Sequence, residues 1–383
     1  MKTWKIVNCR ENVTGKGGVV MRKRWKKLCA VGASLILTMS MLTGCGGGGK
    51  SSASGEKVEL NIMVWDQDYD ESVFKAFEEQ TGIHVNIGYI DNTDTILSKL
   101  VQGSESYDLL DMESAYIKSF VDNGLLAEID HSKIENEKYI KKEYYKGYTG
   151  DEDLKYTVPV VGPIYTCVLY NKETCPIEIK SFADLADPAL KNQVCMVNST
   201  ISLFGMALQS LGYSADSTDE KEIAEAADLL TDIKGNVKAF VGESAIPNLE
   251  NGECSVAYCW DYMNLCNASK DNWDKYAVAE IPGGAECSCP YLAIPSSSKH
   301  VEEAEMLINF LLDPEQYAVS INAFGALPIL EEDCLQPYLK DDFYDNPAIA
   351  VDEKLYDDSW KIAVNDDQIS LLDTYYTKLM SGN

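Results

Sequence analysis

The chain has 383 residues, of which 45% are hydrophobic and 25% charged, a composition that supports a folded core and excludes wholesale disorder. Its formal net charge is −28, and the part after residue 45, with 24 basic and 60 acidic residues, carries −36. So acidic a body repels nucleic acid and anionic lipid headgroups. Either solubility or a field that gathers cations would explain this charge, and the sequence leaves both interpretations open.

The cysteines follow no metal-binding pattern. Nine of the twelve lie beyond residue 45, and the closest two, Cys287 and Cys289, form C-x-C rather than C-x-x-C. Only three histidines are present, and they are far apart in the sequence. We therefore expect no metal site and no cofactor, and we expect buried free thiols with one or two disulfides.

The N-terminal segment, residues 1–45, is typical of an export signal. From Met21, the more natural start, a basic stretch precedes the apolar run Leu28–Leu42. That run is shorter than the roughly 20 residues of a membrane-spanning helix and suits a signal peptide. Residues 42–45, Leu-Thr-Gly-Cys, then match a lipoprotein signal whose Cys45 takes the lipid. A short anchor helix with an incidental cysteine is the alternative.

Residues 46–56, GGGGKSSASGE, form a flexible tether. The sequence thus predicts an extracytoplasmic protein, lipid-anchored to the cell membrane and lying in the periplasm or on the outer face.

Strand-like and helix-like segments alternate beyond the tether. The strands are expected at 58–65, 84–90, 107–112, 165–170, 193–197, 237–241 and 255–260, and the helices at 70–80, 93–101, 115–121, 181–185, 203–211 and 221–234. This alternation predicts mostly parallel sheets with helices on both faces. A break near Pro159–Pro163 divides the pattern into two α/β lobes.

Polar and aromatic residues follow the predicted strands. Ligands of open α/β sheets bind outside the carboxyl ends of the strands, and two facing lobes would bring those ends together across a cleft. The candidate ligand-binding residues are Trp65, Asp66, Asp68, Glu113, Ser199, Ser202, Trp260 and Asp261. Each also has a structural interpretation: the tryptophans could pack in the core, the serines could cap a helix, and the acids could be surface charges.

Catalytic motifs are absent from the sequence. It contains no G-x-S-x-G, no Walker A and no H-E-x-x-H. We assign no catalytic residue and expect no enzyme. A secreted carboxylate-dependent hydrolase is the enzymatic alternative, and a surface adhesion or sensor lipoprotein is a third possibility.

Several motifs in order resemble the spermidine/putrescine-binding proteins of ABC importers, within the extracellular solute-binding family. They are Val64-Trp65, FEEQTGI at 77–83, YDL at 107–109, NGLL at 123–126, residues 159–171, ALQSLGYS at 207–214, LAIP at 292–295, LINFLLDPE at 307–315 and Tyr375-Tyr376. The resemblance implies an α/β, two-lobed periplasmic-binding-protein fold of type II with a hinged interlobe cleft. Lobe 1 would comprise 57–162 plus about 288–322, and lobe 2 would comprise 163–287 plus about 323–383.

The resemblance also implies the function. A monomer would capture a small solute, a polyamine or related amine, and deliver it to ABC permease subunits in the membrane. Polyamine binders hold ammonium groups with carboxylates and enclose the methylene chain between aromatic rings. Trp65 and Trp260 match two family aromatics, whereas Ser199 and Ser202 stand where the family has Asp and Glu, and Asp68 stands where it has Tyr.

The family's W-x-D falls in the stretch 287–290, Cys-Ser-Cys-Pro. A cation site would therefore have to be rebuilt from Asp66, Asp68, Glu113 and Asp261. A neutral or zwitterionic solute, such as a sugar or an amino acid held by Ser and Asn side chains, is the alternative ligand.

Overall fold

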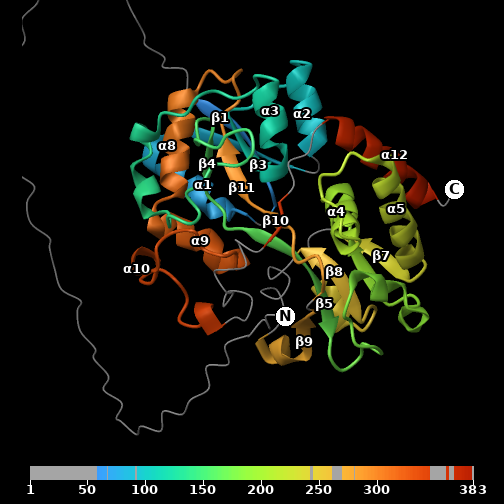
Figure 1. The fold of residues 1–383 in the computed structure, drawn as a ribbon. Coiled ribbons are helices and arrows are strands. Elements are labelled where there is room, and N and C mark those ends of the chain that lie inside the picture. Colours follow the sequence, from blue (N-terminus) through green and yellow to red (C-terminus); the bar gives the residue numbers. More distant parts are fainter. Residues whose placement is uncertain are drawn as a thin grey trace, which may run out of the picture. The chain divides into compact units, whose positions relative to one another are not determined.

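Two β-sheets of mixed strand direction carry the fold (Figure 1). The computed structural model describes residues 58–66, 68–90, 93–241, 245–260, 270–279, 281–345, 359–361 and 366–381. All of them belong to one unit of the chain. Among the described helices, none combines the length and apolar character that a membrane span needs.

The first sheet has the strand order β2-β1-β3-β11-β4. The three strands at the start of the chain run parallel, and β11 is antiparallel to both of its neighbours. The prediction of mostly parallel sheets is wrong, since five of the nine described strand pairings are antiparallel. In this sheet the antiparallel strand is β11, which enters directly from the second sheet with no crossover helix to restore its direction. The strands are β1 (Glu59–Val64), β2 (His84–Tyr89), β3 (Leu109–Glu113), β4 (Thr157–Pro159) and β11 (Pro290–Ala293).

Alternating apolar side chains give this sheet two buried faces. Leu60, Ile62 and Leu109 pack beneath α1 (Glu71–Thr81), α8 (Val301–Leu311) and α9 (Pro314–Phe324). Leu110 and Met112 face the other way, toward α2 (Thr93–Val101) and α3 (Ile117–Asp122). Successive residues of a strand point to opposite faces, so a run such as Leu109–Met112 fills both cores.

Local signals set the bounds of α1. The Asp70 side chain accepts a hydrogen bond from the Ser72 backbone N–H at 2.9 Å, which caps the first turn. The helix ends at Gly82, whose φ of 76° lies in the left-handed region that glycine adopts without strain. Its buried residues Val73, Phe74 and Phe77 follow helical spacing, as the sequence predicts.

The second sheet has the order β10-β5-β8-β6-β7, with β9 also paired to β5. Strand β6 is parallel to β7 and β8, and β5 is antiparallel to β8. The strands are β5 (Ile164–Asn171), β6 (Val194–Val197), β7 (Val237–Val241), β8 (Val256–Trp260), β9 (Tyr276–Val278) and β10 (Cys287–Ser288).

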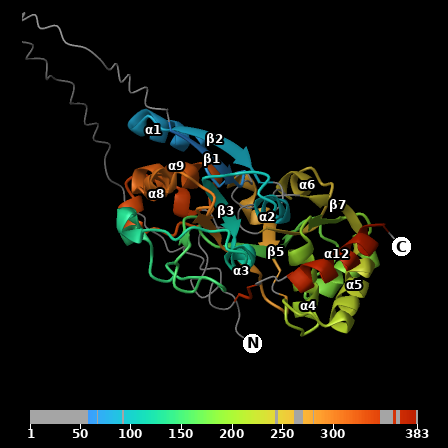
Figure 2. The ribbon, with the colours of Figure 1, turned by 90° about the horizontal axis from the view of Figure 1, so that it is seen from above.

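Helices cover both faces of the second sheet. On one face lie α4 (Thr200–Ser210), α5 (Glu220–Lys234) and α12 (Asp366–Ser381), which stay together in both Figure 1 and Figure 2. The other face carries α6 (Ile246–Glu250) and a disulfide between Cys195 and Cys254. The described free thiols are Cys167, Cys175, Cys259, Cys287, Cys289 and Cys334.

Short helices complete the described elements. They are α10 (Glu332–Leu335) and the 3-10 helices η1 (Ser114–Tyr116), η2 (His131–Lys133), η3 (Glu135–Tyr139), η4 (Phe182–Ala186), η5 (Pro188–Leu190), η6 (Lys270–Lys275) and η7 (Phe343–Asp345).

The stretch after α9 packs on the first lobe, whereas the predicted boundary at about 322 assigned it to the second lobe. Ile329, Leu330 and Leu335 belong to the core of the first sheet, and Leu330 forms a bridge with Ile140. Gly325, with a φ of 77°, ends α9 and lets the chain turn back over the first lobe. Among the described C-terminal residues, Trp360 and α12 pack on the core of the second lobe.

Candidate ligand-binding site

One strand segment joins the two sheets. β10 pairs with β5 of the second sheet, and β11, two residues further on, pairs with β3 of the first. Between them Cys289 bonds to Ser114 in both directions: the Ser114 N–H donates to the Cys289 carbonyl at 3.0 Å, and the Cys289 N–H donates to Ser114 Oγ at 3.1 Å. Residues 286–290 are therefore called the crossing strand.

The lobes share one buried cluster beside the crossing strand. It combines Tyr116 of the first lobe with Tyr165 and Ile201 of the second, and Cys287 and Cys289 of the crossing strand lie within it. This contact zone between the lobes, with the acidic side chains that border it, is called the seam.

Glu286 is a buried acid at the seam. Its side chain is 4% exposed, and its Oε2 atom has no hydrogen-bond partner among the described residues. Burial, and then repulsion from Glu113, raise the pKa of Glu286 to about 8, although the Ser202 hydroxyl acts in the opposite direction. An unpaired carboxylate in such a place costs several kcal/mol, so the group favours a proton or a bound cation.

Glu113 approaches from the first lobe, at the end of β3. Thr93 Oγ1 donates a hydrogen bond to its Oε1 at 3.2 Å. Burial of the carboxyl group, and then repulsion from Asp94, raise the pKa of Glu113 to about 7. The two glutamates thus come from opposite lobes, and each opposes the ionisation of its neighbours.

Two further acids border the seam. Asp94 of α2 accepts a hydrogen bond from the Tyr116 hydroxyl at 3.2 Å. Burial and the charge of Asp373, on α12 of the other lobe, raise the pKa of Asp94. Among the described residues, none of the ion pairs involves Asp94, Glu113, Glu286 or Asp373. These four acids therefore have no ion-pair partner among the described residues, although the charge of Lys361 acts on Cys287 nearby, and such acids suit a cationic ligand.

The two predicted tryptophans lie at strand ends, one in each lobe. Trp65 follows β1, the neighbour of β3, and packs half-buried against the seam cluster. Trp260 ends β8 in register with Thr166, whose N–H donates to the Glu286 carbonyl at 3.2 Å. Trp260 packs on the core of the second lobe, and Trp360 contacts both that core and the seam cluster.

Ser199 caps α4 at its N-terminus, and Ser202 lies in the first turn of this helix. The Ser202 N–H donates to Ser199 Oγ at 3.3 Å, and the two hydroxyls are 3.0 Å apart. Ser202 is fully buried and lies near Glu286, so the capping pair also faces the seam. The structural and the ligand-binding interpretations of these serines are therefore compatible.

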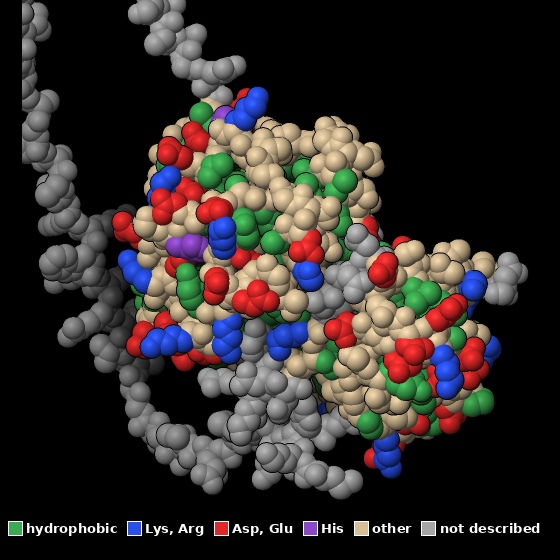
Figure 3. Space-filling view, turned by 45° about the horizontal axis from the view of Figure 1, so that its top comes forward, with side chains coloured by type: hydrophobic (Ala, Val, Ile, Leu, Met, Phe, Trp, Pro, Cys, Tyr) green, Lys and Arg blue, Asp and Glu red, His purple; other side chains and the backbone are tan. Residues whose placement is uncertain are grey.

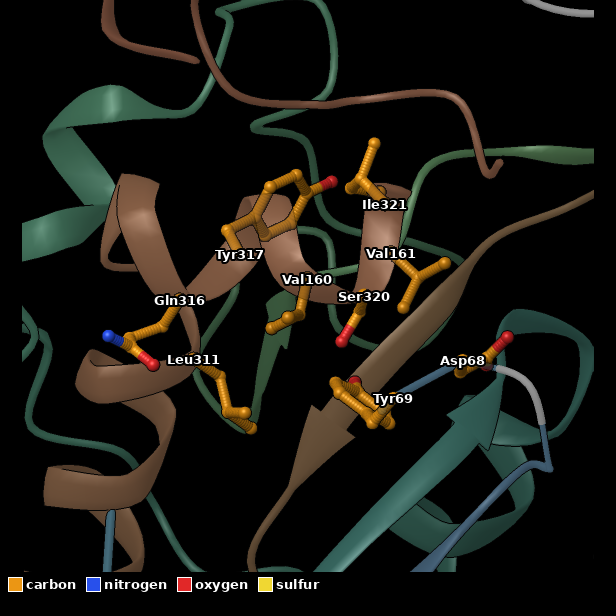
Figure 4. A pocket seen from close by; sticks show the side chains of 9 residues that line it. All are labelled: Asp68, Tyr69, Val160, Val161, Leu311, Gln316, Tyr317, Ser320 and Ile321. Carbon is orange, nitrogen blue, oxygen red and sulfur yellow. The ribbon is translucent and has the colours of Figure 1, made fainter. Parts of the chain in front are cut away.

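Asp66 and Asp68 lie elsewhere. Asp66 is exposed, whereas Asp68 is buried inside the first lobe with Tyr69 and Asp111. With Tyr317 and Ser320 of α9, Asp68 and Tyr69 line a cavity of about 10 Å³, enough for one water molecule (Figure 4). Asp261 and Cys45, the other predicted site residues, lie outside the described part of the chain.

Sequence reasoning missed Glu286, Asp94 and Thr93. A usable signal existed for Glu286, since it is the only charged residue between positions 281 and 298. β10 has two residues, too few for an alternating pattern, so the crossing strand was not predicted.

The family of bacterial extracellular solute-binding proteins matches residues 72–350. The chain belongs to this family. The expected two-lobed α/β fold and the solute-binding function are thereby confirmed.

Relatives of this solute-binding protein include the spermidine/putrescine-binding periplasmic protein of Salmonella typhimurium, 26% identical over 94% of this chain and 99% of the relative. The putrescine/cadaverine-binding protein of Pseudomonas aeruginosa is 26% identical over 76% of this chain and 83% of its own length.

Solved structures of other proteins have a similar fold. A protein of Listeria monocytogenes described as a spermidine/putrescine ABC transporter has a TM-score of 0.75 and 25% identity, covering 85% of this chain and 99% of that one. A lipoprotein of Treponema pallidum has a TM-score of 0.70 and 22% identity, covering 84% and 99%.

Figure 3 shows how charge is distributed on one face of the molecule. On the face shown in Figure 3, acidic side chains are scattered with Lys and Arg among them rather than gathered in one patch. On this face the acidic surface is of the kind that solubility requires.

Proposed function

We propose that this solute-binding protein is the capturing subunit of an ABC importer and that its solute is a polyamine or a related amine. Glu113 and Glu286 hold the ammonium group, and Trp65 and Trp260 flank the methylene chain. The lobes close over the solute, and permease subunits in the membrane receive it.

The buried Glu286, whose Oε2 atom has no partner among the described residues and whose charge is opposed by Glu113 across the seam, carries this proposal. Closing an empty seam confines two carboxylates in a place that opposes their ionisation. An ammonium group offers three donors and a compensating charge, and a hydrogen bond to a charged group contributes about 1.5–3 kcal/mol. A ring face adds about 0.5–2 kcal/mol. The solute therefore makes closure favourable.

The names of the relatives support an amine. The Salmonella protein is named for spermidine and putrescine, and the Pseudomonas protein for putrescine and cadaverine. This chain differs from the family pattern where Ser199 and Ser202 replace acids. Glu113 and Glu286 supply the missing charge from other strands.

The remaining assignments form part of the same proposal. The chain acts as a monomer and carries out no catalysis. Lipid on Cys45 holds it at the membrane, residues 46–56 act as the tether, and the lobe divisions given above describe its body, with the stretch to about residue 345 on the first lobe.

Calorimetric titration of the full-length protein in detergent tests the solute class. Putrescine and spermidine are compared with 1,4-butanediol, which keeps the four-carbon chain and replaces each ammonium by a hydroxyl. We expect tight binding of the amines and none of the diol. Amine affinity should rise from pH 5 to pH 8, because the seam carboxyls ionise over that range. Equal affinity for the diol, or no amine binding, would overturn the proposal.

A further inference from the structure

Two thiols on the crossing strand lie in contact. The Sγ atoms of Cys287 and Cys289 are 3.8 Å apart, and the side chains are 2% and 6% exposed. Alternate residues of an extended strand point to the same side, which brings both sulfurs into the seam cluster. No role assigned above uses this pair.

The pair sits where the chain leaves one sheet and enters the other. Cys287 is in register with Tyr165 of β5, and its N–H donates to the Trp360 carbonyl at 2.8 Å. Cys289 is held by Ser114 of the first lobe through the two hydrogen bonds given above. A change in the distance between the sulfurs therefore acts on the connection between the lobes.

The chemistry of Cys287 favours reaction. Burial opposes its ionisation, but the Cys289 thiol and the positive charge of Lys361 outweigh that effect and lower the pKa of Cys287. A thiolate is the nucleophile in thiol–disulfide exchange. Proteins outside the cytoplasm meet oxidising conditions in which disulfides form and persist.

We propose that Cys287 and Cys289 form a redox-active pair that small-molecule disulfides oxidise and small thiols reduce. The Cys287 thiolate attacks one sulfur of the small disulfide, whose S–S bond breaks and releases one thiolate that takes up a proton. Deprotonated Cys289 then attacks the Cys287 sulfur of the mixed disulfide and expels the second small thiolate. The protein loses two electrons and two protons, and the small disulfide becomes two thiols.

Oxidation changes the crossing strand. A disulfide bond is about 2.05 Å long, so the two sulfurs must approach by roughly 2 Å. The backbone around Ser288 must twist to allow this, which disturbs the pairing with β5 or the bonds to Ser114. Glu286 directly precedes the pair and moves with it. Oxidation therefore weakens solute capture, a consequence that rests on the proposed function, whereas the disulfide itself does not.

Peptide mass spectrometry after thiol alkylation tests the pairing in the full-length protein equilibrated with oxidised and reduced glutathione. In oxidising buffer we expect the peptide with residues 287–289 to carry an internal disulfide that dithiothreitol reverses. Cys287→Ser and Cys289→Ser should each abolish it, whereas Cys334→Ser, at a half-buried thiol that packs on the core of the other face of the first sheet, should leave it. Alkylated thiols at both positions in oxidising buffer, or linkage to another cysteine, would overturn the pairing.

Two measurements test the proposed redox switch, in which oxidation of the Cys287–Cys289 pair alters the connection between the lobes and weakens solute capture. Putrescine affinity should fall at least tenfold on oxidation of the wild type and stay constant in the Cys287→Ser/Cys289→Ser double variant. Small-angle scattering of the solute-free protein should show different lobe separations in the two redox states, whatever the solute is. Identical scattering curves and identical affinities would overturn the switch. Absence of amine binding together with a redox-dependent curve would overturn the proposed solute and support the switch.

Discussion

Among the described residues, two pairs of acids that contain carboxyl groups with a pKa raised by burial differ in the origin of their members. Asp68 and Asp111 both belong to the first lobe and lie with the Tyr69 hydroxyl. Glu113 and Glu286 come from opposite sides of the seam. Burial raises the pKa of Asp111 to about 7 and that of Glu286 to about 8, so the electrostatic cost is similar in kind. The difference lies in when that cost arises.

An acid pair within one lobe forms as soon as the lobe folds, so lobe closure leaves its energy unchanged. Under the proposed closure, an acid pair across the seam comes together as the lobes close. A ligand shifts such an equilibrium by its differential affinity for the two states, and a cation that fits between Glu113 and Glu286 binds the closed state better. The acid pair between the lobes can therefore couple solute binding to lobe closure, whereas the acid pair within one lobe affects only the stability of that lobe.

The largest effect should come from Glu286→Gln, which keeps the shape and removes the charge. We expect about a 100-fold loss of putrescine affinity, because a charge-assisted hydrogen bond contributes about 1.5–3 kcal/mol and 1.4 kcal/mol is a factor of ten. Calorimetry measures this change. Unchanged affinity would place the ammonium elsewhere.

The same variant should alter the pH dependence of stability. The folded pKa of Glu286 lies above its ordinary 4.5, so its ionisation destabilises the wild type progressively as pH rises from about 4.5 to 8. Glu286→Gln should remove that loss, so its free energy of unfolding should exceed that of the wild type at pH 9 and match it at pH 4. Urea titrations of the solute-free protein at both pH values provide the check.

Asp111→Asn is the matched control. It removes a buried charge of similar raised pKa from within the first lobe. Stability should rise relative to wild type above pH 7, whereas putrescine affinity should change by less than about threefold. If Asp111→Asn loses as much affinity as Glu286→Gln, the distinction between the two acid pairs is wrong.

A smaller effect is expected at the tryptophans. Trp65→Ala and Trp260→Ala should each reduce affinity about tenfold, in line with a cation–π contribution of about 0.5–2 kcal/mol. Trp65→Phe, which keeps a ring, should lie between Trp65→Ala and the wild type. Trp273→Ala, on the opposite face of the second sheet, should leave affinity unchanged. A loss at Trp273 equal to that at Trp65 would indicate a general effect of truncation.

The smallest effect is expected at Ser199. Replacing this cap by alanine should cost about 1 kcal/mol of stability, since the Ser202 N–H loses its acceptor. Thermal unfolding measures that cost, and putrescine affinity should change by less than about threefold. A large loss of affinity at unchanged stability would show that Ser199 contacts the solute directly.

Periodicity predicted the longer elements well. The helix expected at 93–101 matches α2. The helix expected at 221–234 matches α5 except that α5 begins one residue earlier, at Glu220. Apolar spacing and capping residues are local, so the sequence contains them. The two-residue β10 has no such pattern, and its place is set by pairing with β5 and by Trp360.

The candidate site was predicted less completely, for a geometric reason. The rule on strand ends identified Trp65 and Glu113, which border the seam. It also identified Asp68, but the turn after Trp65, closed by the Asp68 N–H to the Trp65 carbonyl at 3.4 Å, returns that side chain to its own lobe. Spacing along a chain does not reveal the direction of such a turn. The position of Glu286 at the seam is set by contacts between segments that are far apart in the sequence, and spacing does not predict such contacts.

A crystal structure of the putrescine complex tests the central claim most directly. We expect an ammonium nitrogen within about 3 Å of carboxylate oxygens from both Glu113 and Glu286, with the lobes closed around it. An amine bound at Asp68 and Asp111, or a closed complex in which neither seam glutamate contacts the ligand, would contradict the account.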